Sequence, residues 1–213
     1  DKITGGTGND NITGGGGADV LTGGDGANRF AYTVATDLAS GEQIIGGDDT
    51  DTLYLAGTSQ DYTVTNATTF TSVNAIDSSA AATSLGATLS DTQIAGISTV
   101  TGGDATETYT VSATSTAGPK TVDLSTITLT SLTAGTDSFV VNGAAIADTG
   151  TGYNVTTSAL GDTVTLLDGT NTITGGAGVD SLTGGSGDDT ITGGAGADVL
   201  TGGDGANRFA YTV

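Results

Sequence analysis

The chain of 213 residues contains no cysteine, histidine, methionine or tryptophan, and only one proline. Without cysteine no disulfide can staple the fold, so such a protein needs another crosslink if it works outside the cell. The usual general bases, thiolate nucleophiles and zinc or copper ligands are missing as well. No G-x-S-x-G nucleophile elbow replaces them. The sequence therefore predicts that the protein is not an enzyme, and leaves hard oxygen ligands, which favour calcium or magnesium.

Positive charge is also scarce, because four Lys and Arg residues stand against 24 Asp and Glu residues, a net charge of −20. We expect no unaided binding to nucleic acid or to an anionic membrane, and self-repulsion unless cations neutralise the carboxylates. No apolar run is long enough to span a bilayer, and no signal peptide opens the sequence. We interpret the chain as a piece of a larger protein, so the missing signal says nothing about its parent.

Glycine, in contrast, is abundant, with 37 residues alongside many Val, Ile, Leu and Thr. With a single proline and no collagen period, this composition argues against a disordered linker. It predicts short strands joined by tight turns.

A nine-residue register runs through both ends of the chain. GGTGNDNIT, GGGGADVLT and GGDGANRFA occupy residues 5–31, and GGAGVDSLT, GGSGDDTIT, GGAGADVLT and GGDGANRFA occupy residues 175–210. All fit G-G-x-G-x-(D/N)-x-U-x, where U is a large apolar residue. Glycine at positions 1, 2 and 4 permits backbone angles closed to other residues, and position 6 adds a carboxylate or an amide. Positions 7–9 form a short strand whose middle side chain points inward, so stacked copies predict an apolar ladder beside a column of oxygen cages.

The apolar position of this register continues beyond the glycine-rich copies. Counting back by nine from Phe209 gives Leu200, Ile191, Leu182, Ile173, Val164, Val155 and Ile146. We therefore expect the coil to begin near residue 140, before its turns acquire glycines.

A second, longer period is also present. Residues 180–213 repeat residues 1–34 at an offset of 179, and the last eighteen residues, 196–213, are identical to residues 17–34. We infer that the chain is one period of a tandem array, together with the opening of the next period.

The nonapeptides resemble the RTX (hemolysin-type) calcium-binding repeats of bacterial proteins exported by type I secretion, which form a parallel β-roll. The resemblance implies an all-β fold, with β-roll blocks at both ends, and several Ca²⁺ ions per repeat. In the family one coil holds two nonapeptides, so calcium lies between residues eighteen positions apart. The pairs implied here are Asp1 with Asp19, Asp10 with Asn28, Asp162 with Asp180, Asn171 with Asp189, Asp180 with Asp198, and Asp189 with Asn207.

The resemblance also implies turn carbonyls as ligands. These belong to Gly6, Gly8, Gly15, Gly17, Gly24, Gly26, Gly176, Gly178, Gly185, Gly187, Gly194, Gly196, Gly203 and Gly205. Asn28 and Asn207 stand where Asp is usual. Their amide oxygen brings no charge, so we expect weaker calcium binding at these end sites.

Between the two glycine-rich blocks the pattern loosens. Residues 39–64 resemble the segment that follows RTX blocks, where Asp48, Asp49 and Asp51 either bind one more calcium or form a solvated acidic turn. Residues 65–138 alternate apolar residues with Thr or Ser, which predicts strands, with a short helix in the Ala-rich segment 74–95. GGDATETYT at 102–110 imitates the nonapeptide, with Glu107 at position 6, and suggests a decayed coil.

These patterns divide the chain into four segments. They are a β-roll at 1–34, flanking strands at 35–64, a β-rich and solenoid-like spacer at 65–138, and a β-solenoid at 139–213 that leads into the second roll.

Three functions fit this organisation. The first is a calcium-stiffened structural unit of a secreted surface layer or extracellular filament, whose partners are copies of itself or adjacent repeats. The second is an extender of an RTX adhesin, and the third is the C-terminal calcium module of a secreted enzyme or toxin. The long period argues against the third, because enzymes and toxins of the family generally carry one block, whereas a surface array and an adhesin both need a rigid secreted repeat. All three imply an extracellular or cell-surface location, and no membrane insertion.

Overall fold

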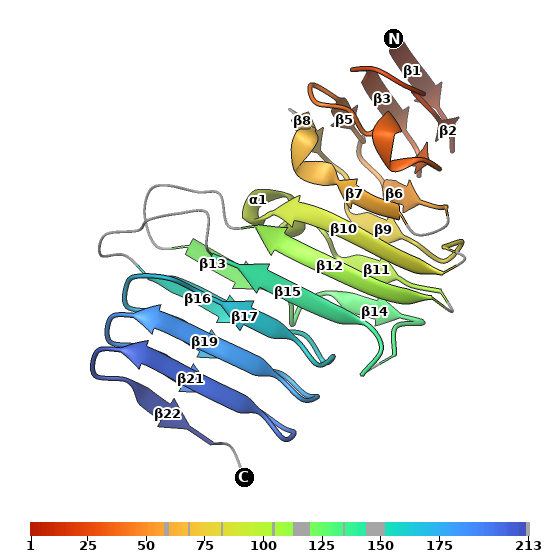
Figure 1. The fold of residues 1–213 in the computed structure, drawn as a ribbon. Coiled ribbons are helices and arrows are strands. Elements are labelled where there is room, and N and C mark those ends of the chain that lie inside the picture. The colour runs from red at the N-terminus through yellow and green to blue at the C-terminus, as the bar shows by residue number, and fades with distance from the viewer. Residues whose placement is uncertain are drawn as a thin grey trace. The chain divides into compact units, whose positions relative to one another are not determined.

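The computed structural model describes residues 1–57, 60–67, 69–81, 83–103, 105–112, 120–133, 135–143 and 152–211. The chain forms two compact units (Figure 1), and each is described by itself. Unit 1 comprises Asp1–Glu107 and Ile127–Leu132, and unit 2 comprises Thr108–Thr126 and Thr133–Val213. The four-segment division made from the sequence stays a prediction.

Unit 1 is built from short strands joined by turns. The elements are β1 (Lys2–Thr7), β2 (Asn11–Ile12), β3 (Val20–Asp25), β4 (Arg29–Tyr32), η1 (Ala35–Asp37), β5 (Gln43–Ile45), β6 (Thr52–Leu55), β7 (Gln60–Thr63), η2 (Val64–Asn66), β8 (Thr69–Thr71), β9 (Ala75–Asp77), β10 (Ser84–Ser90), α1 (Asp91–Ile94), β11 (Thr99–Thr101) and β14 (Thr128–Thr130). Its strands form parallel sheets in the orders β1-β3-β5-β8 and β2-β4-β6-β9-β11-β14, and β7 pairs with β10.

Unit 2 repeats this design with two sheets. The elements are β12 (Thr106–Ser112, which begins in unit 1), β13 (Lys120–Asp123), β15 (Ser138–Asn142), β16 (Tyr153–Thr156), β17 (Thr163–Thr165), β18 (Thr172–Thr174), β19 (Ser181–Ser186), β20 (Thr190–Thr192), β21 (Val199–Asp204) and β22 (Arg208–Ala210). The parallel orders are β12-β15-β17-β19-β21 and β13-β16-β18-β20-β22. Parallel strands that return to the same sheet once per coil make a solenoid, so the predicted all-β fold with β-roll ends is confirmed.

Coil length separates the glycine-rich blocks from the rest. Strands pair at an offset of eighteen residues in the blocks, as in Ile12 with Phe30 and Leu182 with Leu200. The offset is 23 where Leu21 pairs with Ile44. In unit 1 the longer coils hold a third strand, since β5, β6 and β7 are followed by β8, β9 and β10 in the adjoining sheets. Each strand nevertheless sets one central apolar residue beneath the next, so the ladder continues through coils of different length.

The inward positions form the core. Leu21, Phe30, Ile44, Leu53, Ile76 and Val100 are fully buried in unit 1, as are Val164, Ile173, Leu182 and Ile191 in unit 2. Burying each such side chain is worth about 1.5–3 kcal/mol. The count back by nine is therefore confirmed from Ile191 to Val155, while Ile146 lies outside the described residues. Phe209 is 43% exposed, contrary to a buried position, because no described strand pairs with the outer side of β22.

The short helix expected in segment 74–95 is α1. Ser90 caps its N-terminus, and the Gln93 side chain accepts the Ser90 N–H in return, which is a complete capping box. In the part of the chain that the structure describes, no helix is long and apolar enough to cross a membrane.

Candidate calcium-binding turns

The position-6 side chains form columns in which residues eighteen apart are joined. The backbone N–H of one residue donates to Oδ1 of the next: Asp162 to Asp180 (2.8 Å), Asn171 to Asp189 (2.8 Å), Asp180 to Asp198 (3.1 Å), Asp189 to Asn207 (2.9 Å) and Asp10 to Asn28 (3.0 Å). The amino group of Asp1 contacts Asp19 Oδ1. The structure thus brings together the residues of all six pairs proposed from the sequence.

The second carboxylate oxygen has no donor in four of these residues. Oδ2 of Asp10, Asp19, Asp180 and Asp189 is buried without a hydrogen-bond partner. A buried carboxylate oxygen in this state is costly unless a cation or a donor satisfies it. Burial also raises the pKa of Asp180 to about 6. We call the turns of these four residues the open turns.

The orphaned oxygen lies directly against the glycine at position 1. A Cβ on Gly14 would overlap Asp19 Oδ2, and one on Gly175 would lie 2.7 Å from Asp180 Oδ2. Neither glycine has a left-handed φ. From the sequence we expected glycine at position 1 because of its backbone angles. The structure shows instead that a side chain at this position would collide with the carboxylate.

The asparagine copies show what the orphaned oxygen faces. Asn28 Nδ2 donates to the carbonyls of Gly24 (3.3 Å) and Gly26 (2.8 Å), the glycines at positions 2 and 4 of its own turn. Asn207 Nδ2 donates in the same way to Gly203 O (3.1 Å) and Gly205 O (3.5 Å). A Cβ on Gly23 would meet Asn28 Nδ2, just as one on Gly14 would meet Asp19 Oδ2. The amide nitrogen therefore occupies the place of the Asp oxygen, and that place faces backbone carbonyls.

Carbonyls of one coil also lie against glycines of the coil eighteen residues later. A Cβ on the later glycine would overlap the earlier carbonyl for Gly6 under Gly24, Gly8 under Gly26, Gly176 under Gly194, Gly178 under Gly196, Gly185 under Gly203 and Gly187 under Gly205. The coil that follows Gly15 and Gly17 is offset by 23 residues, so Leu38 and Ser40, not glycines, stand at the equivalent positions. Gly15 and Gly17 adopt φ of +84° and +107°, and a Cβ added to either would have no atom within 4 Å.

Three other position-6 carboxylates close their turns internally. Oδ2 of each accepts the N–H of the residue four positions earlier: Asp51 from Gly47 (2.6 Å), Asp137 from Thr133 (2.6 Å) and Asp162 from Ser158 (2.8 Å). We call the turns of Asp51, Asp137 and Asp162 the hydrogen-bonded turns. In the imitation nonapeptide, Glu107 Oε1 accepts the Gly103 N–H (3.0 Å) in the same way, but its Oε2 is buried without a hydrogen-bond partner, so this turn has features of both kinds.

This closure bears on two of the proposed ligands. Asp51 is fully buried, and its Oδ1 accepts the Asn28 N–H at 2.8 Å, so both its oxygens have donors. Asp49 is exposed and does not share its environment. Asp162 is likewise satisfied, since Phe139 N–H (2.9 Å) and the Ser158 hydroxyl (2.7 Å) also donate to it. The sequence alone did not reveal these donors.

Sequence reasoning also missed Glu42. This fully buried side chain accepts the Asp19 N–H at Oε2 (3.0 Å) and the Tyr32 hydroxyl at Oε1 (2.7 Å). Burial raises the pKa of both Glu42 and Tyr32. Glu42 lies two residues before the inward Ile44, which is the position-6 spacing, and this was the signal that could have found it.

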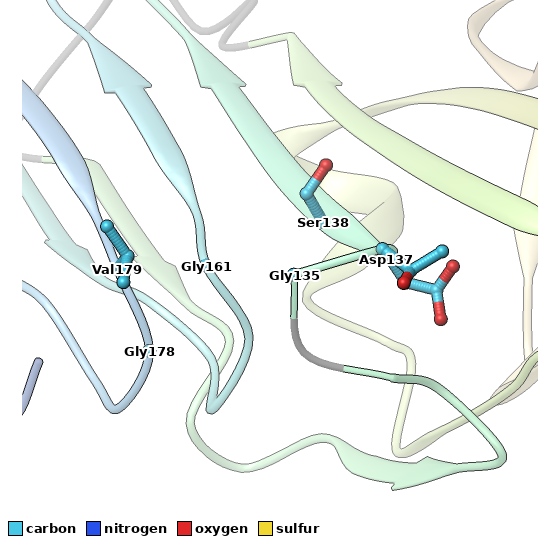
Figure 2. A pocket seen from close by; sticks show the side chains of 7 residues that line it. Gly135, Asp137, Ser138, Gly161, Gly178 and Val179 are labelled. Carbon is cyan, nitrogen blue, oxygen red and sulfur yellow. The ribbon is translucent and has the colours of Figure 1, made fainter.

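A hollow of about 440 Å³ lies beside successive turns of unit 2. Gly135, Gly161 and Gly178 line it, and Figure 2 shows the Asp137 carboxylate on the side away from Val179. Asp137 is the one ionisable residue in this lining, and Thr133 N–H already donates to its Oδ2. The lining therefore offers no catalytic set.

The chemistry of the open turns suits calcium. No three Asp or Glu side chains gather anywhere in the described ranges, so a site there combines few carboxylates with carbonyl oxygens. Such hard, neutral and anionic oxygens are the ligands that Ca²⁺ takes in proteins. Comparison with protein families matches the RTX calcium-binding nonapeptide repeat, in four copies, at residues 1–30, 157–191 and 174–209. No curated protein and no solved structure matches the chain.

Proposed function

We propose that this chain, an RTX-repeat protein by the matches at both of its ends, is a calcium-bound structural repeat of a large secreted bacterial surface protein. RTX repeats bind calcium. The finer role, a unit of a surface layer or extracellular filament, is our inference from the arrangement of the repeats.

The open turns carry this proposal. Asp10, Asp19, Asp180 and Asp189 each hold a buried oxygen without a donor. The asparagine copies show that carbonyls of positions 2 and 4 face the same place. These carboxylates and carbonyls would hold Ca²⁺, which supplies the positive charge that the turn itself lacks. Asn28 and Asn207 would then need no ion in their own turns, because an amide already donates to the carbonyls.

Charge couples this binding to folding. The chain carries a net charge of −20, and its position-6 carboxylates stack in columns. Metal binding that relieves such repulsion becomes folding free energy. Extracellular calcium modules have dissociation constants on the order of 10⁻⁴–10⁻³ M, so a chain of this kind stays unfolded in a low-calcium cytosol and folds after export.

The repeat pattern supports an architectural role. The last eighteen residues repeat residues 17–34, and the described coils from residue 152 to residue 211 keep one register without a Pro-rich or Ser-Gly linker. Units joined in this way add end to end and present copies of the same chain as partners. An adhesin extender would share these features, and a terminal module of an enzyme or toxin would not need the long period. We expect no enzymatic activity from the chain itself.

Electron microscopy of a protein made of several covalently joined periods tests this role. In millimolar-range calcium we expect stiff rods, with loss of the rods when a chelator is added. Magnesium at the same concentration is the matched control, because Mg²⁺ demands a tighter octahedral shell and dehydrates reluctantly. Beads joined at freely varying angles in calcium would contradict a rod and would favour an adhesin with tethered domains.

A further inference from the structure

The same eighteen residues occur in two environments in this structure. In the first copy, Phe30 is fully buried and Tyr32 is 1% exposed. In the second copy the equivalent residues, Phe209 and Tyr211, are 43% and 75% exposed. Because residues 17–34 and 196–213 are identical, the side chains cannot cause this difference. What differs is the coil that covers them.

The first copy is covered by β5 and β6. Leu21 pairs with Ile44, Phe30 with Leu53 and Tyr32 with Leu55, all in parallel register. Backbone N–H groups of the covering coil donate to the first copy's carbonyls: Gln43 to Asp19 (2.8 Å), Thr52 to Asn28 (2.8 Å) and Ala56 to Tyr32 (2.9 Å). These bonds use the outer sides of β3 and β4.

Specific side chains complete this cover. Glu42 accepts both the Asp19 N–H and the Tyr32 hydroxyl, and Asp51 accepts the Asn28 N–H. Arg29 lies over the Tyr54 ring, 3.2 Å from its centre, in a cation–π contact. By identity the second copy carries the same groups, at Asp198, Asn207, Arg208 and Tyr211.

We propose that the outer edge of β21 and β22, continued to Tyr211, is a docking edge for a segment with the sequence of residues 35–57. In the array, the next repeat supplies this segment. That the next repeat supplies the segment rests on the proposed function. That the segment fits the edge rests on the eighteen residues that both copies share. An uncovered parallel edge with an exposed aromatic residue takes an added strand readily, and the matching coil is seated on its twin in this same structure.

A second copy's N-terminal edge is the rival occupant, and it fits less well. β2 contains only Asn11–Ile12, whereas β6 pairs with four residues of β4 and reaches Tyr32. A coil of that kind would leave Tyr211 uncovered. It would also offer no counterpart of Glu42 to the Tyr211 hydroxyl.

A binding experiment with the full chain tests the proposal. The chain is held in calcium, its folding is checked by circular dichroism, and a fluorescently labelled peptide of residues 35–57 is titrated by anisotropy. We expect saturable one-to-one binding, which Phe209→Asp weakens by more than about tenfold. Thr165→Asp is the matched control, because Thr165 is exposed on a strand that is already paired on both sides. This variant should bind the peptide as tightly as the unaltered chain.

Further variants keep the result interpretable. Tyr211→Phe removes only the hydroxyl that would meet Glu42, and should weaken binding less than Phe209→Asp while leaving folding intact. Leu53→Asp in the peptide should abolish binding. A chain that folds in calcium yet fails to bind the peptide overturns the docking edge and leaves calcium-dependent folding standing. End-to-end oligomers of the chain that excess peptide does not dissolve would assign the edge to a second copy's N-terminus instead.

Discussion

Asp189 and Asp51 stand at the same point of their coils, yet their turns are closed differently. Oδ1 of each accepts a backbone N–H from the coil before, that of Asn171 and that of Asn28, both at 2.8 Å. Oδ2 of Asp51 also accepts the Gly47 N–H, whereas Oδ2 of Asp189 is buried with no donor. The carboxylate of Asp51 is satisfied by its own chain, whereas that of Asp189 keeps one buried oxygen without a donor.

The backbone at position 2 differs between the hydrogen-bonded turns and three of the four open turns, whereas Gly176 of the Asp180 turn is not left-handed. Gly185, which precedes Asp189 by four residues, has φ of +106°, and Gly6 and Gly15 have +110° and +84°. Gly47 and Ser158, whose N–H groups close hydrogen-bonded turns, are not left-handed. The comparison teaches that the turns of Asp10, Asp19 and Asp189, with a left-handed glycine at position 2, lack the internal donor that closes a hydrogen-bonded turn, and this arrangement suits a cation.

Removing calcium should have the largest effect, and it should affect the open turns before the hydrogen-bonded turns. With a chelator we expect loss of most of the β signal in circular dichroism, and recovery on adding calcium on the order of 10⁻⁴–10⁻³ M. Hydrogen exchange read by mass spectrometry should show the nonapeptides of the open turns, 5–22 and 175–192, losing protection before residues 75–101. A β signal that survives the chelator unchanged would refute the need for calcium.

A pair of glycine substitutions in one turn should have the next largest effect. Gly14→Ala places a Cβ onto Asp19 Oδ2, while Gly16→Ala places one no nearer than 3.9 Å to any atom, and neither position is left-handed. In calcium we expect Gly14→Ala to lower the free energy of unfolding by about 1–3 kcal/mol and Gly16→Ala to change it by less than about 0.5 kcal/mol. Chemical denaturation measures both, and equal effects would show that position 1 does not hold the carboxylate.

Matched Asp→Asn substitutions should separate the two kinds of turn. In Asp189→Asn the amide can donate to the turn carbonyls, as in Asn207, so we expect one calcium fewer and little loss of stability. In Asp51→Asn a donor faces the Gly47 N–H, which costs about 1–3 kcal/mol without changing the number of ions. Isothermal titration calorimetry counts the ions and thermal melting reports stability. Loss of an ion from Asp51→Asn would assign that turn to calcium.

The smallest effect is expected from pH, in chelator. Burial raises the pKa of Asp180 from 3.8 to about 6, so the folded state holds its proton more tightly than the unfolded state does. Protonated Asp180 therefore stabilises the folded state. This contribution to the free energy of unfolding is fully present below the pKa of Asp180 in the unfolded chain and is lost as the pH rises through about 6. The metal-free chain should therefore keep more β signal near about pH 5 than near about pH 7.5. Asp180→Asn should flatten that dependence, and an unaltered pH profile in the variant would remove Asp180 as its source.

Several elements were predictable because they depend on local pattern. The apolar residue at every ninth position predicted the inward ladder from Val155 to Ile191, since alternation on a strand decides which side chain faces the core. The nonapeptide, through its family resemblance, also named the residues that meet eighteen positions apart, such as Asp162 with Asp180. Their role as calcium ligands stays a prediction.

Other features depend on which coil lies above or below, and no local pattern specifies that. The sequence by itself determined the strand period, the turn glycines and the acidic columns, because each follows from residue type and spacing. Only the tertiary structure decided that Oδ2 of Asp51 and of Asp162 has an internal donor while Oδ2 of Asp189 has none. It also decided that Glu42 accepts hydrogen bonds from the Asp19 N–H and the Tyr32 hydroxyl. Identical residues are buried at Phe30 and exposed at Phe209 for the same reason. Burial and hydrogen bonding in a solenoid are shared between neighbouring coils, so they depend on stacking as well as on sequence.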